Sequence, residues 1–162
     1  MSRNFLIAFV IGLVCIAIAV AGILYMQRGA HLDLPGQVLK VRTAPLDENS
    51  SVAMIDFRIS NTSDYPAVVR TVMVYAEEKN GNRLAGETIS DPDAKRVFDA
   101  IPLLGAKYNQ SLILRDRLPP HAVWDRMIGA RFDVPDAKLG DRKRFLITIE
   151  EVDGKVFEIS EK

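Results

Sequence analysis

Few residues of this sequence have the types and spacing that catalysis requires. The chain contains two histidines, His31 and His121. A nucleophilic triad would have to combine Ser111, His121 and Asp125, but nothing around Ser111 resembles the Gly-x-Ser-x-Gly turn of a nucleophile elbow. His121 follows two prolines, which is typical of a solvated turn. The sequence therefore predicts no catalytic residues and a protein that is not an enzyme.

Metal and phosphate sites are not predicted either. Asp91-x-Asp93 begins like a calcium-binding loop, but the fifth and twelfth positions are Lys95 and Pro102, which are not ligands. Residues 103–107 (LLGAK) have neither the spacing nor the Ser/Thr of a phosphate-binding loop. We therefore expect no cofactor and no metal ion.

Arginines and aromatic residues around two turns are better suited to binding than to chemistry. In "RDRLPPHAVWDR" they flank a double proline, and a second group lies at the Ser-Asp-Tyr-Pro turn. Arginine and tryptophan are enriched at binding hot spots. In the alternative interpretation, the tryptophan packs into the end of the domain and the arginines pair with Asp116 and Asp125. The candidate interaction surface comprises Arg115, Arg117, Trp124, Arg126, Tyr65 and Arg70.

Two other patterns have simple structural interpretations. The densest basic run, Lys138 to Arg144, is expected to be a solvated loop, and the alternative is a contact with lipid headgroups or an acidic partner. Asn49, Asn61 and Asn109 begin Asn-x-Ser/Thr sequences, which would carry glycans in a secreted eukaryotic protein and are otherwise turn residues.

Composition limits the class of protein. The 162 residues include 21 basic and 21 acidic side chains, so no electrostatic footprint for nucleic acid is present. The one cysteine, Cys15, lies in an apolar segment and excludes both an intrachain disulfide and a cysteine-based zinc site. Beyond that segment, roughly 130 residues remain, which is the size of one domain.

The apolar segment Phe5–Met26 predicts a transmembrane helix. As a helix its 22 uncharged residues would extend about 33 Å, which matches the hydrocarbon core of a bilayer. A cleaved signal peptide is the alternative, because 19–21 (AVA) resembles a cleavage site. The basic residues on both sides do not fix orientation, and a short N-terminal tail favours an external C-terminal domain. Residues expected within the membrane span include Phe5, Gly12, Cys15, Ala21 and Met26.

The rest of the chain has the pattern of short strands. Apolar and polar residues alternate over 55–60, which is typical of a half-buried strand, and 67–77 is apolar on both faces, as in a central strand. Further strands are expected at 39–43, 83–89, 111–115, 123–134, 144–151 and 155–160, with turns at Asn80-Gly81 and Asp153-Gly154.

One segment changes to a helical period. Asp91 is the candidate N-cap of a helix over Pro92–Ile101, whose apolar side chains fall on one face. The expected fold is mainly β: an antiparallel immunoglobulin- or fibronectin-like β-sandwich of about seven or eight strands with one short inserted helix, preceded by one transmembrane helix. The expected divisions are an anchor over residues 1–28, a linker over 29–36 and a β-sandwich over 37–162.

The stretches "FRISNTSDYPAVVRTVMVYAEEKNGNRLAGETI" and "LPPHAVWDRMIGARFDV" resemble the FxLYD and water-stress (late-embryogenesis-type) β-sandwich domains. The likeness extends over Val52–Ile159 and rests on Asn61, Gly81 and the step 118–121 (LPPH), with the helix as an insertion. The layout is also similar to short bacterial membrane proteins of unknown function. The resemblance implies a sandwich fold in an extracytoplasmic setting and assigns no catalytic residues.

Together these patterns predict a single-pass protein of the inner (plasma) membrane, with its β domain periplasmic or extracellular. The expected function is a non-catalytic protein-binding or scaffolding module with a protein partner in the cell envelope. The alternatives are a stress-protective domain of the water-stress type, and a small-ligand carrier or enzyme accessory domain. An apolar pocket with a few convergent polar groups would favour the carrier.

Overall fold

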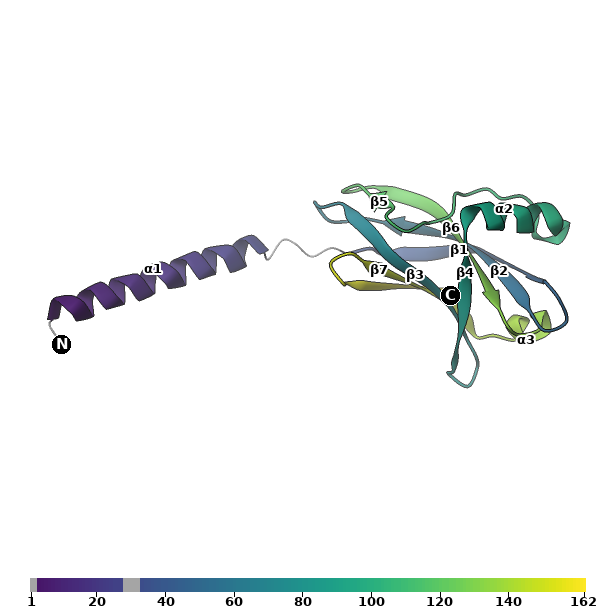
Figure 1. The fold of residues 1–162 in the computed structure, drawn as a ribbon, viewed down its shortest axis with the longest axis horizontal. Helices are drawn as coiled ribbons and strands as arrows, with labels where there is room; N and C mark the ends of the chain where they lie inside the picture. The colour runs from purple at the N-terminus through teal and green to yellow at the C-terminus, as the bar shows by residue number, and fades with distance from the viewer. Residues whose placement is uncertain (1–2, 28–32) are drawn as a thin grey trace. The chain divides into compact units, whose positions relative to one another are not determined.

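The computed structural model describes residues 3–27 and 33–162. Contacts divide the chain into two compact units, residues 1–31 and residues 32–162, and each is described by itself (Figure 1). Part of the predicted linker 29–36, together with His31, lies outside the described residues.

The first unit contains one helix, α1 (Arg3–Gln27), which includes all five residues chosen to represent the predicted span. The described side chains of α1 are apolar, and Cys15 is exposed. Over the residues that the structure describes, no helix satisfies the combined criteria of length and hydropathy for crossing a membrane. The predicted transmembrane helix therefore has no support from this criterion.

The second unit is an antiparallel β-sandwich. Its strands are β1 (Gly36–Pro45), β2 (Ser51–Ser60), β3 (Ala67–Glu77), β4 (Arg83–Ile89), β5 (Arg117–Leu118), β6 (Val123–Phe132), β7 (Arg144–Glu151) and β8 (Val156–Ser160). They pair in the order β1-β2-β6-β4-β3-β7-β8, and β5 adds to β3. The mainly antiparallel fold predicted from the alternation is confirmed.

Strand β4 belongs to both sheets. Its first half, up to Gly86, pairs with β3, and Glu87–Ile89 pair with β6. One sheet is therefore β1-β2-β6 with the end of β4, and the other is β3-β7-β8 with its beginning. The main core lies between them, and its largest fully buried side chains include Phe57, Phe132, Phe145, Ile147 and Ile149.

A second core covers the outer face of the first sheet. Helix α2 (Asp91–Ala100) and the 3₁₀ turn η1 (Pro102–Leu104) pack on β1, β2 and β6. This core contains Val52, Met54, Phe98 and Met127. Strand β2 is consequently buried on both faces from Ser51 to Phe57, where the alternation had predicted a half-buried strand.

The start of α2 differs from the prediction. Ser90, not Asp91, is the N-cap, and its hydroxyl accepts a hydrogen bond from the Asp93 N–H. Asp91 is the first helical residue, and its carboxylate instead accepts bonds from Lys107 Nζ (2.7 Å) and the Ser111 N–H (3.1 Å). Asp91 therefore does not cap α2, and its carboxylate forms a long-range ion pair with Lys107.

The strand predicted over 111–115 does not form. Ser111 makes a single parallel bridge to Met127, and the chain then turns at Arg115, whose φ of 68° is left-handed. The turn is closed because Asp116 N donates to Ile113 O while its carboxylate accepts from Ile113 N. Only Arg117 and Leu118 then pair as a strand, β5, with the start of β3.

The basic run Lys138–Arg144 is a loop only in part, although the side chains of Lys138 and Lys143 remain 53% exposed as expected. It overlaps α3 (Asp136–Gly140), a short helix that the sequence analysis missed and whose Leu139 is fully buried. Acidic residues distant in sequence pair with it: Glu78 with Lys138, Glu161 with Arg142, and the buried Glu77 with both Lys143 (2.7 Å) and Arg144 (2.8 Å). These pairs neutralise the cluster and leave little net charge for a lipid surface.

Candidate functional site

The two turns that the sequence singled out meet at one end of the sandwich. Asn61, which is 1% exposed, donates from Nδ2 to the backbone oxygens of Tyr65, Leu118 and Pro119. His121 Nε2 lies 2.9 Å from the Asp64 carboxylate. We call this region, made of turns 60–66 and 113–123, the Asn61 end; it lies opposite α3 in the domain (Figure 1).

Trp124 and Arg126 are engaged within the domain at this end. Trp124 is half-buried and packs against the main core, and the Arg126 guanidinium lies 4.0 Å from the centre of its ring. Asp125 pairs with Arg58 through two bonds of 2.7 and 2.9 Å. The alternative interpretation, in which Trp124 packs into the domain, is therefore confirmed for the tryptophan. Its predicted pairing of Asp125 with the arginines of this surface is not, because the Asp125 carboxylate binds Arg58 and not Arg126.

The segment 113–117 presents a different surface. Ile113 and Leu114 are 51% and 62% exposed, and Arg115 and Arg117 are exposed with no ion-pair partner among the described residues. Backbone bonds of 2.8 and 2.9 Å join Arg115 N to Val69 O and Val69 N to Asp116 O. Two aliphatic and two cationic side chains are thus held out to solvent on a fixed backbone.

The remaining predicted residues lie nearby along β3. Tyr65 is 54% exposed at the turn before β3. Arg70 is exposed within β3 and pairs with Glu150 at 3.2 Å. The structure therefore brings all six predicted residues to the same end, but leaves Tyr65, Arg115 and Arg117 as the ones whose side chains are both exposed and unpaired among the described residues.

An apolar groove beside this segment was not predicted. We call it the β4 groove: it opens where β4 leaves β3, and has a volume of about 490 Å³. Its floor includes Val72, Leu112 and Ile128, which belong to the main core. Its walls are formed by the start of α2 and by the loop before β5, with Ile89, Pro92, Ile113, Leu114, Thr88, Ser90 and Asp91.

Asp91 supplies the charge at the rim of this groove. The bond from Lys107, followed by those from Ser111, lowers the pKa of Asp91 from 3.8 to about 2, so the carboxylate is ionised at any physiological pH. Lys107 Nζ and Ser111 N both donate to Oδ1 of this carboxylate, at 2.7 and 3.1 Å. The groove therefore combines an apolar floor with an Asp91–Lys107 ion pair at its rim.

The groove was missed because its parts are far apart in sequence. It requires β4 to change partners between Gly86 and Glu87, and no local pattern indicates such a change. The one local signal of the groove was the apolar run 112–114 (LIL). The sequence analysis assigned this run to a strand, whereas Ile113 and Leu114 lie in an exposed loop.

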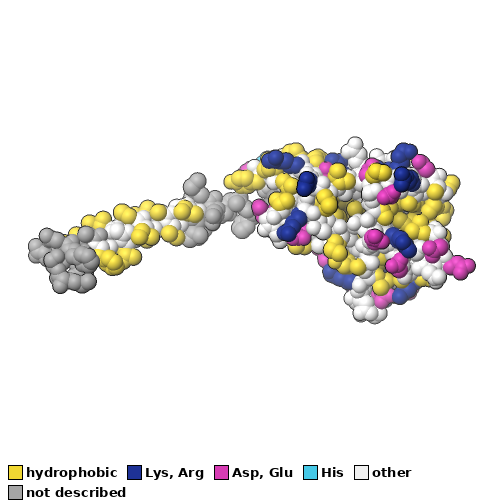
Figure 2. All heavy atoms as spheres, viewed as in Figure 1, with side chains coloured by type: hydrophobic (Ala, Val, Ile, Leu, Met, Phe, Trp, Pro, Cys, Tyr) yellow, Lys and Arg dark blue, Asp and Glu magenta, His cyan; other side chains and the backbone are white. Residues whose placement is uncertain are grey.

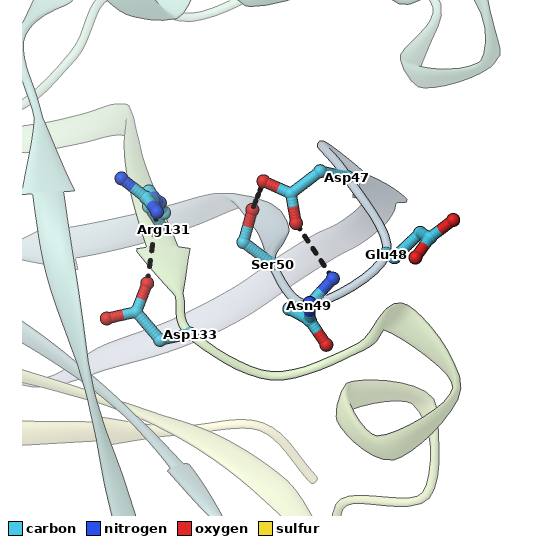
Figure 3. Close-up of a pocket in the computed structure, with 6 residues that line it drawn as sticks. All are labelled: Asp47, Glu48, Asn49, Ser50, Arg131 and Asp133. Carbon is cyan, nitrogen blue, oxygen red and sulfur yellow. Dashed lines mark hydrogen bonds and ion pairs between the residues drawn. The ribbon is translucent and has the colours of Figure 1, made fainter.

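A second hollow, of about 540 Å³, lies at the turn between β1 and β2 (Figure 3). Its polar side chains largely satisfy one another. The Asp47 carboxylate accepts bonds from Ser50 Oγ and Asn49 N, and these bonds lower the Asp47 pKa. Arg131 pairs with Asp133 at 3.1 Å. Glu48 also lines the hollow and takes no part in these bonds.

The residues considered for chemistry do not assemble into a site. His121 faces Asp64, Asp125 faces Arg58, and Ser111 is buried beside Met127. Within residues 3–27 and 33–162, no group of three or more His, Cys, Asp or Glu side chains could hold a metal ion. Over the visible face of the β domain, basic and acidic side chains are interspersed (Figure 2).

Comparison with known proteins finds similarity in fold only. No protein-family model matches the sequence, and no curated sequence matches it. An uncharacterised β-sandwich protein from Clostridium difficile is 14% identical, with a TM-score of 0.39, over 80% of this chain and 85% of its own. A candidate ApaA protein from Bordetella pertussis is 16% identical, with a TM-score of 0.38, over 81% of this chain and 89% of its own.

Proposed function

We propose that this protein is a single-pass, N-terminally anchored membrane protein whose β-sandwich acts outside the cytoplasm as a non-catalytic protein-binding module. The observation that carries the binding role is the exposed segment 113–117. Its aliphatic pair and its two arginines are held by backbone bonds to Val69. Arginine beside exposed apolar side chains is the chemistry of a protein–protein hot spot, and a fixed backbone reduces the entropy lost on binding.

The anchor is supported by the sequence and by the surface of α1. Phe5–Met26 has no charged residue. Apolar side chains are exposed throughout its described part, including Phe9, Ile11, Ile16 and Ile18 at 58–66%. A helix that is apolar all round is favoured in lipid or in a protein core and is not typical of a surface helix.

The proposed domain type is immunoglobulin-like. Strands β1, β2 and β6 face β3, β7 and β8, with β4 shared at the edge. If the two-residue β5 is left out of the count, these are the first, second and fifth strands opposing the third, sixth and seventh, which is the arrangement of immunoglobulin-like sandwiches. Such a sandwich displays its turns at two ends, and these are where binding residues are usually placed.

The β4 groove favours a second candidate function, the carriage of a small apolar ligand. Seven of the residues that line it are apolar and three are polar. This is the balance expected of a ligand pocket, and the volume of about 490 Å³ is within the usual range.

Capture of the partner from gently solubilised membranes tests the binding module. The full-length chain with a C-terminal tag is compared with an Arg115→Glu/Arg117→Glu variant. The matched control is Lys95→Glu/Arg96→Glu on α2, where the same charge change falls on exposed side chains. We expect a partner that wild type and control retain and that the Arg115/Arg117 variant loses. No specific partner, or equal capture by all three, would overturn the proposal.

A further inference from the structure

We infer that the Asn61 end of the β-sandwich rests on the surface of the bilayer, through four exposed apolar side chains. This inference rests on the anchor in the proposed function and adds a second membrane contact, made by the domain itself. It is carried by three observations: where the chain enters the domain, which side chains are exposed there, and how few residues lie between that point and the predicted span.

The chain enters the β domain at the Asn61 end. Ser60 N donates to Pro35 O at 2.9 Å, and Thr62 donates from both its N and its Oγ1 to Asp33 O at 3.3 Å. These bonds fasten the entering chain to the end of β2, and β1 then runs away from that end for ten residues. The turn at the other end of β1 is therefore about 30 Å distant.

The turn between β7 and β8 lies at this same end of the domain. Val152 N donates to Val68 O at 3.1 Å, and Val68 pairs with Arg117 of β5. Six large apolar side chains that are 49–62% exposed gather here: Tyr65, Ile113, Leu114, Val123, Val152 and Val156.

Four of these side chains form a surface separate from the proposed protein-binding segment. Ile113 and Leu114 belong to segment 113–117, which the proposed function assigns to a protein partner. We call the other four, Tyr65, Val123, Val152 and Val156, the Tyr65 patch. None of them takes part in the arginine site, so the two surfaces can be altered independently.

A short connection keeps this end near lipid. Residues 27–32 separate Asp33 from Met26, the last residue of the predicted span. A stretch of this length reaches at most about 20 Å. A connection so short gives an effective concentration on the order of millimolar, so a contact of only millimolar affinity is already populated. Covalent connection therefore selects the bilayer as the surface that the Tyr65 patch meets.

The composition of the patch suits a bilayer surface. Tyrosine is enriched where a membrane meets water, because its ring is apolar and its hydroxyl is polar. The three valines add apolar surface that is stabilised by burial at the boundary of headgroups and acyl chains. Exposed charged side chains around the patch are of both signs: Asp33, Asp64, Asp153, Arg115, Arg117 and Lys155. We therefore expect the contact to depend on apolar burial and not on anionic lipid.

Fluorescence quenching in nanodiscs tests the inference. The full chain, carrying Cys15→Ser, is incorporated singly into phosphatidylcholine nanodiscs. An environment-sensitive dye is attached at Val152→Cys or, as the matched control, at Leu46→Cys in the turn at the opposite end of β1. Nitroxide-labelled phosphatidylcholine is the quencher. We expect quenching at least about twofold stronger at residue 152, because a contact at millimolar effective concentration is populated half of the time or more.

Substitutions in the patch locate the contact. With the dye at Tyr65→Cys, a Val123→Glu/Val156→Glu variant should lose most of the quenching. The control Leu46→Glu/Leu103→Glu, which changes two exposed aliphatic side chains away from this end, should keep it. Both variants alter only exposed positions, so the fold is kept. Equal quenching at residues 152 and 46, or quenching at residue 65 that survives Val123→Glu/Val156→Glu, would overturn the inference.

This inference and the proposed function fail separately. If the chain stays with the nanodiscs and the two labels are quenched equally, the anchor stands and the inference is wrong. If the chain does not stay with the nanodiscs, the anchor is wrong and the inference is wrong with it. Loss of partner capture in Arg115→Glu/Arg117→Glu reports on the binding role alone, because that variant leaves the Tyr65 patch intact.

Discussion

Arg42 and Asp56 form a buried ion pair that no local pattern indicated. The two side chains are 8% and 5% exposed and lie 2.6 Å apart. Arg42 also donates to the backbone oxygens of Leu104 (3.0 Å) and Ala106 (2.7 Å), and Asn109 donates to Asp56 at 2.9 Å. The pair therefore fastens the loop after α2 to β1 and β2, and that loop leads into the wall of the β4 groove.

Removing one member of this pair should be costly. Asp56→Ala leaves the Arg42 charge buried without its partner, and we expect it to lower the free energy of unfolding by about 3–5 kcal/mol. Urea unfolding followed by the fluorescence of Trp124, the one tryptophan of the chain, measures the change. The control is Asp125→Ala, which breaks the exposed Arg58–Asp125 pair and should cost about 0–1 kcal/mol. Similar losses in the two variants would contradict this account.

Asp91 gives the domain a pH dependence at the acidic extreme. Its pKa is about 2 in the folded chain, against 3.8 for the ordinary carboxyl. Because the folded pKa is the lower one, the ionised form stabilises the fold above about pH 4, and this contribution is lost as the pH falls from about 4 to 2. Unfolding of Asp91→Asn should therefore differ from wild type most at pH 5–7 and converge with it near pH 2. A constant difference across this range would show that the bonds to Lys107 and Ser111 do not depend on the charge.

At the scale of elements, the passage of β4 between the sheets depends on small residues. A Cβ on Gly86 would lie 2.6 Å from Cζ of Phe132 and 3.0 Å from Ala130 Cβ. Phe132 is 2% exposed and packs on Phe145, with ring centroids 5.8 Å apart, so its ring cannot move aside freely. Glycine at this position therefore allows β4 to lie close to β6 where it changes partners.

Gly86→Ala should destabilise the domain by about 1–3 kcal/mol through overpacking. The matched control is Gly140→Ala in α3, where an added Cβ meets nothing within 4 Å and alanine is the better helix former. Thermal unfolding of both variants measures the difference. A Gly86→Ala protein as stable as the control would show that β6 can shift to accommodate the extra methyl group.

At the scale of the whole molecule, the proposed anchor predicts how the protein partitions. The full chain should sediment with membranes and stay there through an alkaline carbonate wash, because an apolar helix is held by lipid and not by charge. A chain that begins at residue 33 should appear in the soluble fraction. External protease should digest the β domain of intact spheroplasts if it lies outside the cytoplasm. Release of the full chain by carbonate would contradict the anchor, and protection from protease would contradict the orientation.

The sequence by itself determined the features that depend on local periodicity. Alternation of period two located β2 and β6, and the run 67–77 that is apolar on both faces located β3. The turns at Asn80-Gly81 and Asp153-Gly154 located β4 and the hairpin of β7 and β8, and the change to a helical period located α2 to within one residue at each end. These predictions succeeded because each strand or helix must turn its own apolar face to a core, and that requirement is written in consecutive residues.

Only the tertiary structure decided the features that need partners from distant parts of the chain. The basic run became a neutral network because Glu77 and Glu78 at the end of β3 and Glu161 after β8 approach it from distant parts of the sequence. The β4 groove exists because β4 changes partners from β3 to β6, and segment 113–117 is held in place by its backbone bonds to Val69 of β3. The pattern of consecutive residues determines which side chains of a strand face the core. Ion pairs and grooves depend on which distant segments folding brings together, and the sequence of a single strand does not specify its distant partners.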